Sequence, residues 1–358
     1  MLRQHNTCHT TEAGLGAQWR SAPREQPPAA QPKGLRRLAS RSSGDHVKVT
    51  RRRFLLAAAG AIAAILGYKV LKLIPEEKPP PARKPAPRSR PVVAVVKGGA
   101  VAVRKAIELI GGLKLSGRAV VKPNVGFSSR SAVTSPEVVA ELIKVLYEAG
   151  ASEVIVAESS VRGSSTRHCF ERTGYYRVLK PLGVDVIDLK EQDDTVTVKA
   201  ESTLRLKEVS VYELPYRADF LASVAKMKRH ASAEVTLGMK NLIGCFPDSE
   251  KGRFHRAGLH ECIADIAYIL KPSLVVVDAT EAMTKRGPTG GVMVPANTVI
   301  ASTDPLAADY IAAKLLFQLE GAENPGERAA AVKHLRYAQQ LGLGAMGSEV
   351  EVRVAQPP

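Results

Sequence analysis

Polar residues follow several apolar runs of this chain, at the points where we expect strands to end. Lys97-Gly98-Gly99, Lys122-Pro123-Asn124 and Glu158-Ser159-Ser160 follow three such runs, and a further group extends from Lys226 to His230. A lysine directly after a buried strand is costly unless an anionic or carbonyl-bearing group meets it. Because ligands of open parallel sheets bind at the carboxyl ends of the strands, these groups together predict one pocket at that edge.

The residue types indicate what such a pocket could do. Ammonium and carboxamide groups bind acid and carbonyl oxygens, so the candidate substrate-binding residues are Lys97, Lys122, Asn124, Lys226, Lys228 and Asn241. Glu158 is included with them because it follows an apolar run at the same predicted edge. The candidate catalytic residues are His230, Asp278 and Lys240. His230 or Asp278 could move a proton, and the lysines could bind or polarise the acid group. Each residue alone is also explained as a loop charge or a helix cap, and for Asp278 both interpretations stay open.

Metal ligation is a second interpretation of the same region. We expect His230 between a strand and a helix over residues 234–243, where the positive end of the helix dipole favours the neutral imidazole. The candidate metal ligands are His230, His255, His260 and Cys245, with the second and third in a mobile loop that contains Gly252. Their spacing matches neither H-x-x-x-H nor a cysteine pair. A metal or redox cofactor stays an alternative, without the cysteine motif of an iron–sulfur cluster.

Strand-like and helix-like segments alternate between residues 92 and 345, which predicts a single α/β domain with a mostly parallel sheet and helices on both faces. Ser135 and Pro136 are typical of a helix start, and Gly150 of a helix end. Between Asp194 and Tyr212 the polar and apolar residues alternate, which predicts a small antiparallel excursion. Further helices are predicted over residues 101–110, 166–182, 259–270, 305–316 and 327–340, and a C-terminal tail over residues 346–358.

The N-terminal part of the chain predicts a cellular location rather than a fold. Thr50 to Leu56 precede an apolar stretch that is short for a spanning helix, which is typical of a twin-arginine export signal over residues 50–74. No small-residue cleavage site follows, so residues 54–74 could instead stay as a membrane anchor. Residues 1–49 are predicted to be disordered or a mis-assigned start, and the proline-rich residues 75–91 a stiff linker. The twin-arginine translocase is the predicted export partner.

Most of the positive charge lies in this leader. The whole chain has a formal net charge of +16, but residues 1–90 hold 18 Lys and Arg against 5 Asp and Glu. The remaining residues are therefore near neutral, and the overall charge does not describe a phosphate-binding face. We accordingly expect no nucleic acid among the partners.

A set of short motifs occurs in a fixed order along the predicted domain. These are Lys122-Pro123-Asn124, Lys226-x-Lys228-x-His230, Val235 to Gly244, Val277-Asp278-Ala279, Gly287-Pro288-x-Gly290 and Asp304-Pro305-x-Ala307-x-Asp309. In order and spacing they resemble the "domain of unknown function 362" family over most of residues 92–312. The resemblance implies a fold and a site at these motifs, but no activity. Some members of that family append a ferredoxin-like module, which this chain lacks.

Three functions are compatible with these observations. The first is an enzyme outside the cytoplasm, in the periplasm or on the outer face of the cytoplasmic membrane, that acts on an anionic or carbonyl-bearing small molecule. The second is a metal-binding or cofactor-binding redox protein. The third is a protein that binds a small-molecule ligand without changing it.

Overall fold

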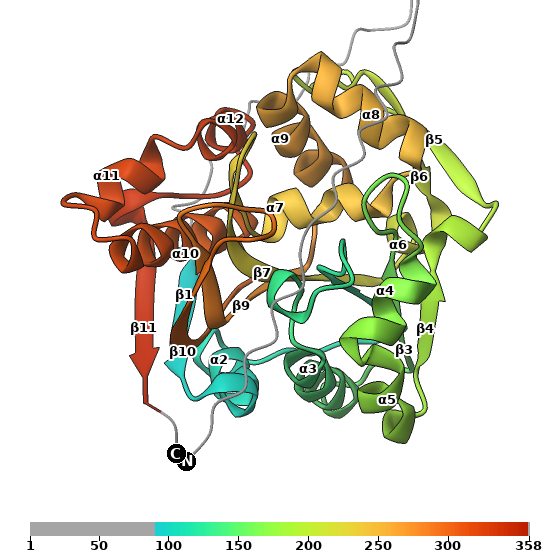
Figure 1. Cartoon of the computed structure of the whole chain (residues 1–358), viewed down its shortest axis with the longest axis horizontal. Coiled ribbons are helices and arrows are strands. Elements are labelled where there is room, and N and C mark those ends of the chain that lie inside the picture. Colours follow the sequence, from blue (N-terminus) through green and yellow to red (C-terminus); the bar gives the residue numbers. More distant parts are fainter. Residues whose placement is uncertain (1–89, 357–358) are drawn as a thin grey trace, which may run out of the picture. The chain divides into compact units, whose positions relative to one another are not determined.

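The computed structural model describes residues 90–356 (Figure 1). The predicted export signal, anchor and disordered segment, and all but the last two residues of the predicted linker, lie outside the described residues. No helix within residues 90–356 combines the length and the apolar character needed to cross a membrane.

The described chain is built on a nine-stranded sheet with the order β11-β1-β10-β9-β7-β2-β3-β4, and β8 pairs with β7. The neighbours β7, β2, β3, β4 and β9 pair in parallel, whereas β10 runs against both β1 and β9. The strands are β1 (Val92–Lys97), β2 (Arg118–Pro123), β3 (Glu153–Glu158), β4 (Asp185–Asp188), β7 (Phe220–His230), β8 (Glu234–Thr236), β9 (Leu274–Thr284), β10 (Val292–Ser302) and β11 (Glu351–Ala355). The predicted fold class, an α/β fold with a mostly parallel sheet, is confirmed.

Helices cover both faces of this sheet because consecutive strand residues alternate between two apolar cores. Val120 belongs to one core and Val121 to the other. The first core is packed by α9 (Leu259–Leu270), α10 (Pro305–Leu319) and α12 (Lys333–Gln340). The second is packed by α2 (Ala102–Leu109), α3 (Pro136–Glu148), α4 (Thr166–Thr173) and α5 (Tyr175–Leu179). Figure 1 shows α2, α3 and α5 at the bottom of the view and α9 and α12 at the top.

The smaller elements complete the predicted plan. The antiparallel excursion is confirmed as a separate two-stranded sheet of β5 (Thr195–Lys199) and β6 (Glu208–Tyr212). The remaining helices are α6 (Glu213–Tyr216), α7 (Gly238–Asn241), α8 (Asp248–Ala257) and α11 (Pro325–Ala330).

Several predicted element boundaries differ from the structure. The predicted helix over residues 234–243 is wrong in its first half, because Glu234–Thr236 folds back on β7 as the antiparallel strand β8. The predicted helix over residues 166–182 is broken at Gly174, whose φ of 87° no helical residue can adopt. The last predicted helix is two helices, α11 and α12. The segment predicted to be a tail contains β11, which pairs in parallel with β1.

Candidate functional site

A cavity of about 430 Å³ lies at the carboxyl ends of β2, β3 and β7, where α7 and α8 also meet. Its lining is strongly cationic: six basic side chains face one carboxylate, that of Glu158. The basic residues are Lys122, Arg162, Lys228, Lys240, Lys251 and Arg256. Because clefts lined by charge of one sign concentrate ions of the opposite sign, this cavity favours an anionic occupant.

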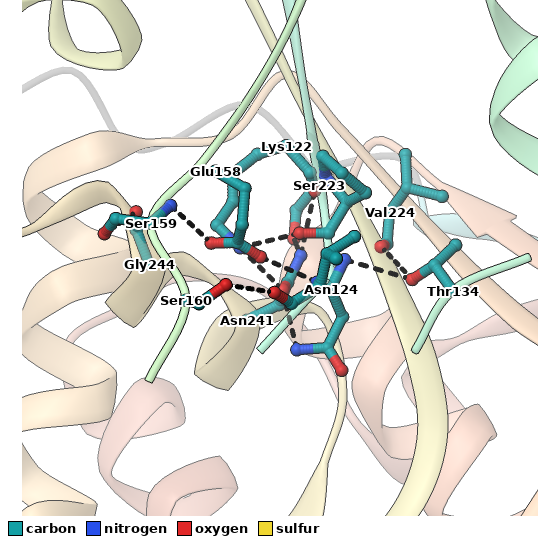
Figure 2. Close-up of polar contacts among 12 residues, drawn as sticks. Lys122, Asn124, Thr134, Glu158, Ser159, Ser160, Ser223, Val224, Asn241 and Gly244 are labelled. Atoms are coloured by element: carbon teal, nitrogen blue, oxygen red, sulfur yellow. Dashed lines mark hydrogen bonds and ion pairs between the residues drawn. The ribbon is translucent and has the colours of Figure 1, made fainter. Parts of the chain in front are cut away.

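The Lys122 ammonium is held entirely by the protein. Its Nζ donates to Glu158 Oε2 at 2.7 Å, to the Pro123 carbonyl at 2.7 Å and to Asn241 Oδ1 at 2.9 Å (Figure 2). An ammonium has three donors, so none is left for a ligand. Glu158 is equally committed, since its oxygens also accept the amides of Val125 and Ser159. The pair is therefore a scaffold on which the cavity is built.

Asn241 extends this scaffold from the sheet to α7. Its Nδ2 donates to the Lys122 carbonyl at 2.9 Å and to Ser223 Oγ at 3.0 Å, and its Oδ1 accepts from Asn124 at 3.3 Å. Gly244 packs so closely here that a Cβ would lie 2.0 Å from Glu158 Oε1. The network therefore fixes the end of β2, the helix α7 and Gly244 against one another.

Lys251 on α8 is a second lysine without a free donor. Its Nζ donates to the carbonyls of Ser159 and Ser160 at 3.0 and 2.7 Å, and to Asp248 Oδ1 at 3.0 Å. These bonds fasten α8 to the segment that leaves β3. Like Lys122, Lys251 contributes positive charge to the cavity but no donor for a ligand.

Two other lysines are not committed in this way. Lys228 Nζ donates only to the Ala132 carbonyl, at 2.5 Å, and lies 5.2 Å from the ring centroid of Phe127. Lys240 Nζ has no hydrogen bond or ion pair with any residue in the range 90–356. Burial, and next the positive charge of Lys240, lower the pKa of Lys228 well below its usual value. Burial, followed by Lys122, lowers the pKa of Lys240 to about 8.

Lys240 is uncommitted although its neighbours in α7 are fixed. The amides of Gly238 and Met239 donate to the buried Asp309 carboxylate at 2.7 and 2.9 Å. A Cβ on Gly238 would lie 2.3 Å from Val275 Cγ1, so this turn packs directly against β9. Asn241 on the other side is held by the Lys122 network. Lys240 is thus placed at the cavity by the bonds of the residues around it.

His230 is a hydrogen-bond donor toward the cavity rather than a base. It is the last residue of β7, and its Nδ1 accepts the amides of Ser232 and Ala233, each at 3.1 Å. Burial and then the charge of Lys240 lower its pKa to about 2, so the ring is neutral and its proton resides on Nε2. The expected neutral form holds, but its cause is burial and nearby lysines, because a hairpin and no helix follows His230. Because Nδ1 already accepts two amides, it is not available as a base.

Of the two cavity histidines, His255 is the one whose ring has no hydrogen-bond partner among residues 90–356. It lines the cavity from α8 and forms no hydrogen bond within the described part of the chain. Burial and the charge of Lys240 lower its pKa, which keeps it neutral at neutral pH. The predicted mobile loop around Gly252 is instead the helix α8. His255 is therefore available to accept a proton from a bound ligand.

The other predicted site residues lie elsewhere. Lys97 lies on β1, which β10 and β9 separate from β7, and its Nζ donates to the Ala296 carbonyl at 2.8 Å. Lys226 pairs with Asp278 at 3.2 Å, and the Asp278 oxygens also accept from Ser135 and Thr280. These bonds account for the burial of Asp278 as a structural contact near the start of α3. The β7–β9 register shifts between Lys226 and Lys228. Lys226 lines a different cavity, together with Thr280.

Of the four predicted metal ligands, His230 and His255 line the cavity, whereas His260 and Cys245 do not. His260 stacks on the buried His334, with the two Nδ1 atoms 3.4 Å apart. Cys245 is fully buried, and burial raises the pKa of its thiol to about 12. No group of three or more His, Cys, Asp or Glu side chains in residues 90–356 is arranged to hold a metal ion.

Four polar cavity residues lay outside the sequence-based prediction: Arg162, Thr236, Lys251 and Arg256. On α8, residues 251 and 255 share a face, as do residues 252 and 256, because each pair is four residues apart. This spacing was not recognised because the segment was expected to be a loop. Arg162 follows the predicted polar exit of β3 by two residues. Thr236 gave no signal, because its importance lies in a buried hydroxyl that, like Asn124 Oδ1, has no hydrogen-bond partner among the described residues.

Comparison with known proteins places these residues in a family context. The family described as "Domain of unknown function (DUF362)" matches residues 119–314. A thylakoid-associated protein of Synechocystis sp. is 28% identical over 268 residues, which cover 71% of this chain and 78% of that protein.

Two solved structures are also similar. A Thermotoga maritima protein has a TM-score of 0.36 and 14% identity, covering 67% of this chain and 58% of its own. The lactate racemase apoprotein from Thermoanaerobacterium thermosaccharolyticum has a TM-score of 0.33 and 12% identity, covering 62% of this chain and 56% of its own. The chain thus spans less than two thirds of either structure.

Proposed function

The chain belongs to the DUF362 family, and from the geometry of its cavity we propose that it is an enzyme that binds a small anionic, carbonyl-bearing molecule and moves a proton on it. The observation that carries this proposal is the pair of cavity lysines, Lys228 and Lys240, that have no carboxylate partner among the described residues. A positive charge on a buried or half-buried amine without a partner is costly. An acid or carbonyl oxygen of a ligand would supply the hydrogen-bond acceptor that these two amines lack.

The roles of the cavity residues follow from their free atoms. Lys228 and the Nε2–H of His230 donate to the acid group, and Lys240 contacts the carbonyl oxygen, where negative charge develops when an adjacent C–H bond ionises. His255 accepts that proton, since its ring is neutral and free of other bonds within residues 90–356. Asn124 Oδ1 and Thr236 Oγ1, buried without partners in the described structure, are further contacts for ligand hydroxyl groups.

Ligand binding is tested by calorimetric titration of the full chain with pyruvate, succinate and inorganic phosphate. We expect at least one of them to bind, and Lys240→Met to weaken that binding at least about tenfold, the loss of one charge-assisted hydrogen bond. Lys97→Met is the matched control, because Lys97 lies outside the cavity and should leave binding unchanged. Equal affinities in all three proteins would contradict the assignment.

Proton transfer is tested separately by the exchange of the pyruvate methyl protons in heavy water, followed by NMR. The wild-type chain should accelerate the exchange, and His255→Gln should remove the acceleration while leaving binding in place. Binding without any accelerated exchange would favour the alternative of a protein that holds its ligand unchanged. Mass spectrometry of small molecules that co-purify with the chain would identify the natural ligand in either case.

We also propose that the protein is exported and stays associated with a membrane. Thr50 to Leu56 and the apolar residues that follow support a twin-arginine signal with residues 54–74 as an anchor, and the Synechocystis relative is named as thylakoid-associated. Replacing Arg51 and Arg52 by lysine should hold the protein in the cytoplasm, as cell fractionation would reveal. Unchanged export of this variant would overturn the proposal.

A further inference from the structure

The four cavity lysines differ in what their amines are free to do. Lys122 and Lys251 each place all three donors on protein oxygens. Lys228 places one donor on the Ala132 carbonyl and is almost completely buried. Lys240 alone among these four has neither a hydrogen bond nor an ion pair to the described residues, while its side chain lines the cavity. Its amine is therefore the one that a ligand can approach as a nucleophile.

The surroundings of Lys240 hold this amine ready for reaction. The preceding two amides are fixed by Asp309, and the following side chain is fixed by Lys122 and Ser223. A Schiff-base lysine needs an amine that is neutral for part of the time, and desolvation together with a neighbouring cation is the usual way to produce one. Both conditions are met here, since burial and then Lys122 lower the pKa of Lys240 to about 8.

Lys228 supplies the second recognition element. Lys228 and Lys240 line the same cavity of about 430 Å³, so one small ligand can reach both amines. The two groups differ in availability: one amine is free, and the other is partly bound beside the Nε2–H of His230. A ligand with a reactive carbonyl next to a carboxylate matches this arrangement.

Resting on the proposed function, we propose that Lys240 forms a covalent imine with the carbonyl carbon of a 2-oxo acid whose carboxylate is bound by Lys228 and His230. The neutral amine attacks the carbonyl carbon, so a C–N bond forms. The carbonyl oxygen then leaves as water with the two amine hydrogens. No oxidant or reductant is required. The imine draws electrons from the adjacent carbon, which eases the removal of a proton by His255, and hydrolysis returns the free lysine.

The experiment uses glyoxylate, the smallest 2-oxo acid, with the full-length chain and sodium borohydride. Borohydride reduces an imine to a stable secondary amine, so the modified lysine can be found by peptide mass spectrometry. We expect carboxymethylation of Lys240 at glyoxylate concentrations that leave Lys97 and the exposed Lys105 unmodified. Lys240→Arg keeps the positive charge but cannot form an imine, and should retain calorimetric pyruvate binding while losing the adduct. Lys240→Met should lose both.

The outcomes separate the imine from the proposed function. Saturable pyruvate binding with no adduct on Lys240, or an adduct spread evenly over surface lysines, would overturn the imine and leave the anion-binding cavity in place. The absence of both binding and adduct would remove the proposed function as well. A circular-dichroism spectrum that matches the wild type checks that each variant is folded.

Discussion

Replacing Lys122 by methionine should destabilise the protein severely, because it leaves Glu158 charged and buried. The two side chains are only 1% and 2% exposed, and their charged atoms are 2.7 Å apart. Removing one partner of a buried ion pair typically costs about 3–5 kcal/mol. Lys122→Met also removes the donors that reach Pro123 and Asn241, so we expect a loss toward the upper end of that range.

The assay is urea unfolding of the full chain followed by circular dichroism, with Glu158→Gln and the double variant completing a cycle. Each single variant should lower the free energy of unfolding by several kcal/mol, and the double variant should lose clearly less than their sum, because neither charge is left alone. Arg104→Met is the control, since the Arg104–Glu148 pair lies at the surface and should leave the unfolding midpoint almost unchanged.

One result would refute the assignment of Lys122 to the scaffold. If Lys122→Met unfolded at the same urea concentration as the wild type but lost ligand binding, its ammonium would be serving a ligand and not Glu158. Additive losses in the double variant would likewise show that the two charges do not act as a pair.

Three further predictions concern neighbouring groups. Burial lowers the pKa of His334 to about 3, below the unfolded value near 6.5; the unfolded chain therefore gains protons first as the pH falls, and His334→Phe should remove about 2 kcal/mol of the stability lost between pH 7 and pH 5, measured by urea unfolding. Gly244→Ala should destabilise the chain and lower its melting temperature, because its Cβ would meet Glu158 and Lys122. Gly326→Ala, whose Cβ would meet only the Tyr310 hydroxyl at 3.4 Å, should have a smaller effect. A bound carboxylate should restore the charge of Lys228, so calorimetry in buffers of different ionisation enthalpy should detect proton uptake that Lys228→Met abolishes, and affinity should fall as the pH rises; an uptake that survives in Lys228→Met would contradict this.

Much of the fold could be predicted from the sequence because its signals are local. Alternating β-branched runs and helix punctuation, such as Ser135-Pro136 before α3, depend on neighbouring residues alone. The segment from Glu234 to Asn241 was harder. Its residues are compatible with a helix. The first three form a strand only because they pair with the end of β7, which lies at most eight residues earlier in the chain.

The candidate site could be located from the sequence but not resolved into roles. Lys122, Lys228 and Lys240 do reach one cavity, as their positions after strands and in α7 predict. Whether an amine is saturated or free depends on distant partners such as Glu158 and Asn241, which no local pattern reveals. Asp278 was excluded from the cavity for the same reason, since Lys226 and Thr280 engage it.

The role of His230 also depended on contacts beyond its spacing. A histidine after a strand could be a base, a metal ligand or a donor. The two amides that reach Nδ1 decide among these, and they come from a hairpin turn that the sequence did not predict. The hydrogen bonds that Nδ1 accepts therefore decide the role of His230.

The most direct measurement of the central claim is the NMR titration of Lys240 in the full chain labelled with ¹³C at lysine Cε. The signal is assigned by its absence in Lys240→Arg, and a signal of Lys97 serves as reference. An uncommitted amine in a cationic cavity should titrate near the value of about 8 that burial and Lys122 impose, and pyruvate should shift its signal. Titration of Lys240 at the value of an ordinary exposed lysine, without a response to pyruvate, would contradict the account.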